Sequence, residues 1–398
     1  MSSVTQTTRT SWFRRLFNSV VGALIGIALV FGAIGLLAWN ENRSVNALRT
    51  IAEGRELVVT ADAARVNSGL DEQLIHVPGV AEPVGQLTDQ AFDIELAAIR
   101  LRRTVEMFQW EERSETRTRT NTGGSETRET VYTYRKVWSD RAIDSSGFRN
   151  PSGHTNPGPL PLESRAVDAE DVRLGAYRLA TAYVRKLNDF DILPPTNRQL
   201  TANAATLGLA LAGDRLQSGD PEAPAVGDLR VTFSVVSPGN YTAMGRQVGG
   251  DIVPYEAKHG VIDWIDPGLL SSDEMLALAE QRNSLLTWGL RLGGVVLMFV
   301  ALLLVLSPLR TAADVIPFAG RIVGAGIGLV AIVAALAVSI TVVAVSWFAV
   351  RPILSVLLGG LVFVIFMIGG RLAGARQKTG ASPSAQTALS ENLPGEGT

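Results

Sequence analysis

Hydrophobic residues are concentrated in four long segments, one near the start of the chain and three near its end. They cover residues 17–39, 289–308, 322–347 and 352–370. Because a helix needs about 20 apolar residues to cross a hydrocarbon core of ~30 Å, each segment is long enough to form a transmembrane helix. The pattern predicts an α+β extracytoplasmic domain inserted between one N-terminal and three C-terminal transmembrane α-helices.

The first hydrophobic segment has two interpretations. Arg14 and Arg15 precede it, as in a secretory signal peptide. However, the apolar run is longer than a signal core, and no cleavage site of small residues follows it. Trp39, Asn40 and Glu41 are instead typical of an exit into the membrane interface. An uncleaved signal anchor is therefore favoured over a cleaved signal peptide.

Basic residues are distributed unequally between the two sides of the predicted bundle. With four spans both termini lie on one side, and that side collects eight basic residues against Arg351 opposite: Arg9, Arg14, Arg15, Arg310, Arg321, Arg371, Arg376 and Lys378. This positive-inside pattern assigns both termini to the cytoplasm. The segments outside the membrane are then predicted in this order: a cytoplasmic N-terminus (1–16), an extracytoplasmic domain (40–288), a cytoplasmic loop (309–321), a short external turn (348–351) and a disordered cytoplasmic tail (371–398).

This topology predicts a multi-pass integral membrane protein. In a bacterium it would lie in the inner membrane with a periplasmic domain. In a eukaryotic cell it would lie in the endoplasmic reticulum or inner nuclear membrane with a luminal domain. No charge interrupts residues 292–309, 322–350 or 352–370, so the spans are predicted to anchor the domain rather than to transport a solute.

Two kinds of residue in the spans have predicted packing roles. Small residues at four-residue spacing allow close helix approach, within this bundle or between copies, and they are Gly22, Gly26, Gly320, Gly324 and Gly328. Three tryptophans, Trp39, Trp288 and Trp347, lie at predicted interfaces and are expected to act as interfacial anchors.

Alternating and helical patterns occur together between the anchors. Residues 99–113 and 129–139 predict a long hairpin around Gly123 and Gly124, with Arg and Glu available for cross-strand pairs. Further strands are predicted at 56–60, 73–77, 228–236 and 241–255. Residues 169–188 have helical periodicity. Ser271 and Glu274 form a capping box for a helix that continues into the second span.

Composition excludes several classes of function. Residues 41–287 carry 26 Lys and Arg against 35 Asp and Glu, a net charge of −9, whereas nucleic-acid binding requires a basic surface. The absence of cysteine excludes disulfides, thiolate metal sites and a cysteine nucleophile. His76, His154 and His259 lie in separate segments, and no phosphate loop, dinucleotide fingerprint or nucleophile elbow occurs. No catalytic residue, metal or cofactor is therefore predicted.

Two features of the domain are candidate sites. His154 and Asn156 lie in a Gly/Pro/Asn-rich loop, where they serve either a function or the rigidity of the loop. The charged residues around the predicted hairpin form either a calcium or partner surface or, as the pattern favours, a solvated face with ion pairs.

Several strings resemble one known family. VEMFQWEE at 105–112, TYRKVWSD at 133–140, IDSSGFRNPSGHTNP at 143–157, LESRAVDAEDVRLGAYRL at 162–179, VGDLRVTFS at 226–234, NSLLTWGLR at 283–291 and WNE at 39–41 occur in the order typical of the transmembrane protein 43 (LUMA) family. The resemblance implies one span, a large luminal domain and three spans. It also implies a scaffold of the endoplasmic reticulum and inner nuclear membrane, with emerin, lamins and further copies as partners and no catalytic activity.

Three hypotheses for function follow. The first is a scaffold whose external domain binds other membrane proteins or copies of itself, with the lipid bilayer as its other partner. The second is a membrane-proximal enzyme or a domain that binds lipid or envelope ligands. The third is a sensor that signals through the helix after Ser271, although the loop at 309–321 offers little output surface.

Overall fold

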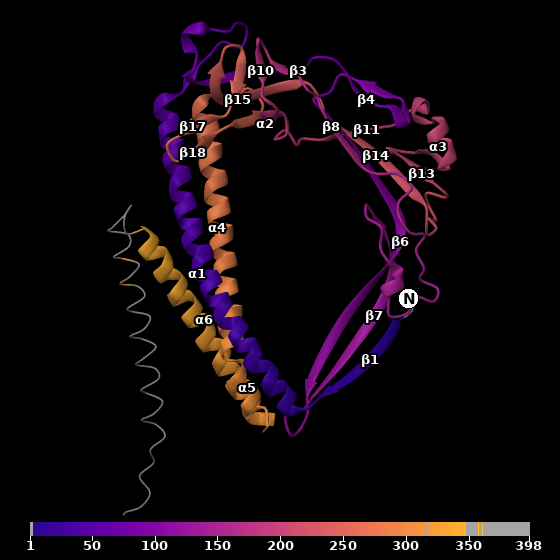
Figure 1. Ribbon diagram of the computed structural model, residues 1–398, viewed down its shortest axis with the longest axis vertical. Coiled ribbons are helices and arrows are strands. Elements are labelled where there is room, and N and C mark those ends of the chain that lie inside the picture. Colours follow the sequence, from indigo (N-terminus) through magenta and orange to yellow (C-terminus); the bar gives the residue numbers. More distant parts are fainter. Residues whose placement is uncertain (1–2, 316, 348–356, 358–359, 361–398) are drawn as a thin grey trace, which may run out of the picture. The chain divides into compact units, whose positions relative to one another are not determined.

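The computed structural model describes residues 3–315, 317–347, 357 and 360. The chain divides into two compact units. The first comprises Met1–Leu16, Arg43–Thr287 and Asp314–Phe318, and the second comprises Phe17–Asn42, Trp288–Ala313 and Ala319–Thr398. Figure 1 shows that strands dominate the first unit and helices the second. Mixed α and β structure, as predicted, therefore accompanies the apolar helices.

The described residues form six α-helices: α1 Trp12–Leu57, α2 Thr181–Val184, α3 Ala202–Thr206, α4 Ser272–Val305, α5 Ser307–Ala313 and α6 Pro317–Trp347. Three segments are long and apolar enough to cross a membrane, namely α1, α4 and residues 323–347 of α6. With 46 residues, α1 is about 69 Å long, more than twice the hydrocarbon thickness. The predicted span at 352–370, the turn before it and the tail after it lie outside the described residues, apart from positions 357 and 360.

An eight-stranded sheet contains the predicted hairpin. Its strands are β1 Ser3–Thr10, β6 Arg100–Thr120, β7 Glu126–Ser139, β8 Arg165–Asp168, β11 Asp191–Leu193, β12 Leu209–Ala212, β13 Arg215–Ser218 and β14 Leu229–Val236. The main order is β1-β7-β6-β14-β13-β12, with β11 on β14 and β8 on β6. Gly123 and Gly124 both have positive φ, as the turn between β6 and β7 requires. The predicted hairpin is confirmed.

A second sheet closes on itself. Its strands are β2 Val59–Thr60, β3 Leu74–Pro83, β9 Val172–Leu174, β10 Tyr177–Leu179, β15 Gly239–Val248, β16 Asp251–Val253 and β19 Trp264–Pro267. Hydrogen-bonded pairs run from β3 through β15, β16, β10 and β9 back to β3, so these five strands form a small barrel. Two minor pairs complete the strands, β4 Leu87–Asp89 with β5 Ile94–Leu96 and β17 Tyr255–Ala257 with β18 Gly260–Ile262.

The predicted helix at 169–188 is wrong. The segment forms β9, β10 and the single turn of α2. Gly175, with φ +61°, reverses the chain between the two strands, and Tyr177 and Tyr183 are fully buried in the core. Barrel closure therefore overrides the helical charge pattern, because every second residue of these strands is buried.

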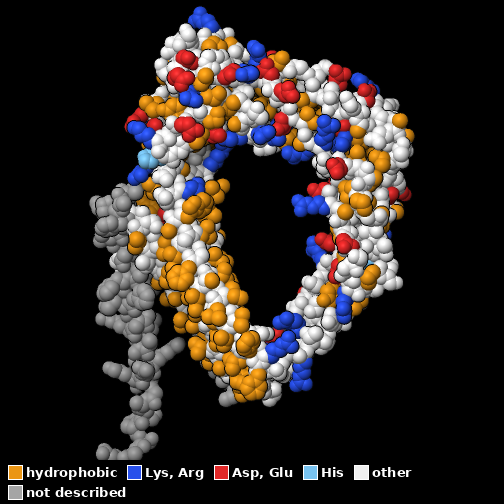
Figure 2. Space-filling view, in the orientation of Figure 1, with side chains coloured by type: hydrophobic (Ala, Val, Ile, Leu, Met, Phe, Trp, Pro, Cys, Tyr) orange, Lys and Arg blue, Asp and Glu red, His pale blue; other side chains and the backbone are white. Residues whose placement is uncertain are grey.

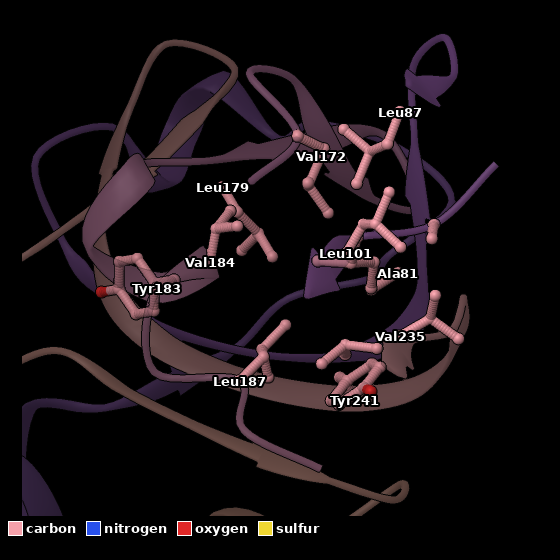
Figure 3. Close-up of a cluster of buried hydrophobic side chains, with 14 of the residues drawn as sticks. Ala81, Leu87, Leu101, Val172, Leu179, Tyr183, Val184, Leu187, Val235 and Tyr241 are labelled. Carbon is pink, nitrogen blue, oxygen red and sulfur yellow. The ribbon is translucent and has the colours of Figure 1, made fainter. Parts of the chain in front are cut away.

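Buried apolar side chains from both sheets form one continuous core (Figure 3). Leu101 from β6, Leu179 from β10 and Val184 from α2 are among the side chains drawn there. A second cluster packs the ends of α1 and α4 against the barrel, with Ile51, Leu74, Met244, Ile262, Met275 and Leu276 buried. The predicted capping box at the start of α4 is confirmed, since Ser271 N donates to Glu274 Oε2 at 2.7 Å and Glu274 N to Ser271 Oγ at 3.3 Å.

His76 joins the barrel to the segment before α4 and should make stability depend on pH. Its Nε2 lies 3.0 Å from Leu270 O, and its side chain is 2% exposed. Burial lowers the pKa of His76, and the hydrogen bond to Leu270 opposes this only in part. Since the unfolded imidazole has a pKa of about 6.5, the unfolded state takes up the proton first, and stability falls as pH drops below that value.

We therefore expect H76Q to reduce the loss of stability of the full chain in detergent between pH 7.5 and 5.5, measured by denaturant unfolding. The matched control is H259Q, because His259 is exposed. Equal pH slopes for H76Q and the parent chain would refute this assignment.

Candidate functional site

The outer part of the hairpin, together with the N-terminal strand, forms a polar three-stranded sheet, here called the arm. It consists of β1, residues 113–120 of β6 and residues 126–133 of β7. Side chains alternate between the two faces, and neither face is apolar. One face bears Arg113, Glu115, Arg117 and Arg119, and the other bears Ser114, Thr116, Thr118 and Thr120. Figure 2 shows hydrophobic side chains gathered along the helices instead.

Ion pairs along the hairpin run mainly within a strand. Arg113 contacts Glu111 at 3.0 Å and Arg117 contacts Glu115 at 3.1 Å, each two residues apart on one face. Arg135 crosses from β7 to Glu111 at 2.6 Å, and this contact lowers the pKa of Glu111. Among these ion pairs, the contact between Arg135 and Glu111 is therefore the one that shows the expected pairing across the strands. Exposed ion pairs of this kind contribute little to stability.

The tip of the arm contacts the start of α1. Arg15 lies 3.1 Å from Glu126 and 2.7 Å from Asp314, and it also donates to Gly124 O. A Cβ on Gly124 would lie 2.4 Å from the Trp12 ring, so glycine is required at this close approach. One arginine thereby holds the hairpin turn, the first turn of α1 and the residue after α5 together.

Strand β1 pairs with β7 along its whole length, from Ser3 opposite Thr133 to Thr10 opposite Glu126. The predicted topology puts residues 1–16 in the cytoplasm and the hairpin outside it, and this assignment stays a prediction. We propose instead that the two paired strands share one compartment. Arg15, one of the basic residues on which the assignment rests, contacts the carboxylates of Glu126 and Asp314.

Single cysteines test whether the two strands share one compartment, on the cysteine-free background of this chain. We expect T5C in β1 and T122C in the hairpin turn to react with a membrane-impermeant maleimide from the same side of sealed vesicles. Both parent residues are exposed. Labelling from opposite sides would separate the two strands and contradict the pairing.

His154 and Asn156 lie together at the base of the arm. The His154 ring stacks on Tyr134 at 4.0 Å and meets Trp110 edge-on at 4.8 Å, while Nδ1 lies 3.0 Å from Asn150 O. The side chain of Asn156 bonds to the backbone of β6 as a neighbouring strand would. Its Oδ1 accepts from Trp110 N at 2.7 Å, and its Nδ2 donates to Trp110 O at 3.0 Å. These contacts attach the loop at 140–161 to β6 and β7.

Tyr134 completes this base. Its Oη donates to Glu112 Oε2 at 2.7 Å and accepts from Asn150 N at 2.9 Å. Burial and the Glu112 carboxylate raise the pKa of Tyr134, so the phenol remains a donor. The base of the arm is a packed, hydrogen-bonded support, in contrast to the exposed arm beyond it.

An ion pair with a buried carboxylate joins the three long helices within the helical unit. Glu41 is 0% exposed and accepts two hydrogen bonds of 2.7 Å from Arg291 and a third from Trp347 Nε1. Of the predicted interfacial anchors, Trp39 and Trp288 are 57% and 65% exposed, whereas Trp347 donates a hydrogen bond to Glu41. From the sequence, Glu41 was predicted only as part of the interfacial exit of the first span and of a family motif. The opposite charges at the ends of two spans were the available signal.

The predicted packing glycines have different surroundings. A Cβ on Gly26 would lie 2.8 Å from Ala301 O and Val305 N, so α1 and α4 approach closely there. Gly22 faces Leu304 and Ser307 at 3.9 Å, and Gly324 faces the Arg310 side chain. A Cβ on Gly328 would meet nothing within 4 Å. Gly320 lies outside the residues whose surroundings are described.

Two cavities among the described residues of the domain are small. One of about 280 Å³ is lined by residues around Pro194 and Phe233, and one of about 260 Å³ lies between Lys186 and Arg282. Drug-sized ligand pockets generally measure about 300–1,000 Å³. Among the described residues, no group of three His, Cys, Asp or Glu side chains is arranged to hold a metal ion.

Three apolar helices joined to a sheet-rich domain define a membrane protein. The family model described as "Transmembrane protein 43" matches residues 107–352. Transmembrane protein 43 of Rattus norvegicus is 30% identical over 92% of this chain and 93% of its own length, and that of Homo sapiens is 30% identical over 90% and 91%. The Drosophila melanogaster homolog is 30% identical over 89% and 93%. The chain belongs to the transmembrane protein 43 family. No solved structure matches it.

Proposed function

We propose that this protein is a multi-pass membrane scaffold whose domain assembles proteins through the arm. The observation that carries the proposal is a polar sheet, exposed on both faces and built on a rigid base. An isolated sheet needs a hydrophobic face or a packed helix for independent stability, and the arm beyond Glu112 has no such face. A bound protein would supply the missing contacts.

The enzyme or ligand-binding alternative has less support. The two cavities are small, and their polar side chains are largely engaged with each other, as in Lys186 with Asp263 and Arg198 with Asp93. Among the described residues, no feature supports the alternative that the protein is a sensor.

Deleting the arm tests the proposal. Since Glu112 pairs with Tyr134, an Asn-Gly turn can replace residues 113–133 and leave the base in place. We expect photo-crosslinking in intact membranes, read by mass spectrometry, to capture higher-order species with the full chain and few with the deletion. The control is E222A, in an exposed loop. Identical crosslinked species from the full chain and from the deletion variant would contradict the proposal.

A further inference from the structure

The turn of the hairpin lies against the first residues of α1, just before the apolar stretch of that helix begins. The Trp12 ring lies against Gly124, and Arg15 donates to Gly124 O. The apolar stretch starts at Phe17, two residues or about 3 Å of helix rise beyond Arg15. A helix that enters the hydrocarbon at Phe17 holds its preceding turn at the level of the lipid headgroups. The hairpin turn, through its contacts with Trp12 and Arg15, would then lie at the same level.

Three exposed arginines belong to this end of the arm. Arg9 and Arg119 are both paired with Thr127, so they project from the same face of the sheet, with their Cα atoms roughly 10 Å apart. Arg14 lies in the first turn of α1. Among the described residues, none of the three forms an ion pair, and Arg9 lies 3.5 Å from the neutral Ser125 Oγ.

Nearby carboxylates leave this positive charge largely uncompensated. Residues 3–16 contain three arginines and no Asp or Glu. Two acids lie on the same face of the arm, but Glu115 is paired with Arg117 at 3.1 Å, and Glu129 is one row further from the turn than Arg9 and Arg119. This end of the arm is therefore suited to an anionic surface.

Exposed aromatic rings adjoin the same arginines. The side chains of Phe13 and Phe17 are 77% and 69% exposed. At a membrane interface, aromatic rings lie at the level of the headgroups, and arginines bind phosphate through paired hydrogen bonds. A free phosphate ion would use the arginines alone, whereas the surface of a bilayer would use both the arginines and the rings. The combination favours a bilayer.

We propose that Arg9, Arg14 and Arg119, here called the basic tip, bind the headgroups of anionic phospholipids in the membrane surface. The inference goes beyond the assembly proposal and is independent of it, because it concerns the turn end of the arm. Arg15 has a different role, since Glu126 and Asp314 neutralise it while it holds the turn in place. Each arginine near an anionic surface raises membrane affinity about fivefold, so the three together favour anionic lipid on the order of a hundredfold.

A lipid titration of the full chain tests the proposal. An environment-sensitive fluorophore on T122C, in the cysteine-free background, reports the surroundings of the hairpin turn. Phosphatidylglycerol is titrated into the protein in neutral detergent, with phosphatidylcholine and inorganic phosphate as comparison ligands. We expect the fluorescence to shift with phosphatidylglycerol alone, and R9Q/R14Q/R119Q to require at least about tenfold more of it.

The hairpin supplies a control of equal charge. The variant R113Q/R117Q/R135Q also removes three exposed arginines, but each of these is ion-paired with Glu111 or Glu115. We expect this control to change the required concentration of phosphatidylglycerol by less than about twofold, because the three side chains lie outside the basic tip and already have countercharges. Equal weakening of the two triple variants would reduce the effect to net charge and overturn the proposal.

Lysine at the same three positions separates loss of charge from loss of fold. The variant R9K/R14K/R119K keeps the charge of the basic tip and should retain most of the affinity for phosphatidylglycerol. A lysine variant as weak as the glutamine variant would contradict binding by charge. An equal response to phosphatidylcholine or to inorganic phosphate would also overturn the proposal. So would a photoreactive group on T122C that captures protein instead of lipid in intact membranes.

Discussion

Replacing Glu41 with glutamine is expected to destabilise the helical unit by about 3–5 kcal/mol, because it leaves a partly buried arginine without a countercharge. Glu41 is fully buried, and its carboxylate accepts from both Arg291 and Trp347, so it links α1 with α4 and α6. The Arg291 side chain is 18% exposed and cannot regain full hydration in the folded state. Denaturant unfolding of the full chain in detergent measures the change.

The chain offers a matched control between two of the same helices. Arg55 and Glu280 also join α1 to α4, at 2.9 Å, but their side chains are 52% and 43% exposed. We expect E280Q to cost less than about 1 kcal/mol, because exposed pairs are screened by solvent. The double variant E41L/R291M should recover much of the loss, since apolar replacement of both partners removes the uncompensated charge. Equal costs for E41Q and E280Q would refute the role of Glu41.

The sequence predicted those elements whose signals are local. The hairpin of β6 and β7 follows from alternation around Gly123 and Gly124, and the start of α4 follows from Ser271 and Glu274. Both signals lie within a few residues of the element that they define. The apolar helices follow in the same way from composition, as three of the four predicted segments correspond to long apolar helices.

Elements that depend on distant partners were missed. The strand Ser3–Thr10 lacks apolar alternation and exists through pairing with β7, more than 110 residues away. Residues 169–188 have a helical charge pattern, but the closed barrel requires two short strands around Gly175. Local propensity is a weak prior where tertiary pairing determines the backbone.

The same difference between local and distant signals applies to the residues of the candidate site. His154 and Asn156 were chosen together as loop residues, and the structure brings them together against β6 through Trp110. Glu41 and Arg291 are separated by 250 positions, and no spacing rule connects them. The contact of Arg15 with Glu126 and Asp314 was equally inaccessible, because it joins three segments that are far apart in the sequence.

Adding one methyl group at Gly245 is expected to destabilise the barrel by about 1–3 kcal/mol or more, through overpacking. Gly245 lies in β15 opposite Ile75, at the centre of the closed circuit. A Cβ there would lie 1.9 Å from Tyr183 Oη and 2.6 Å from Val253 O, and the second of these is a backbone atom that cannot move aside. Thermal or denaturant unfolding of G245A measures the cost.

A double-mutant cycle identifies Tyr183 as the main cause. The Tyr183 Oη lies 3.1 Å from both Met244 O and Val253 O, so Y183F alone should cost about 1 kcal/mol of hydrogen bonding. In the Y183F background G245A should cost less, with a coupling of at least about 0.5 kcal/mol. The control G250A adds a methyl group where nothing lies within 4 Å and should change stability by less than about 0.5 kcal/mol. Strict additivity of Y183F and G245A would show that Val253 O, rather than the phenol, excludes a side chain from this position.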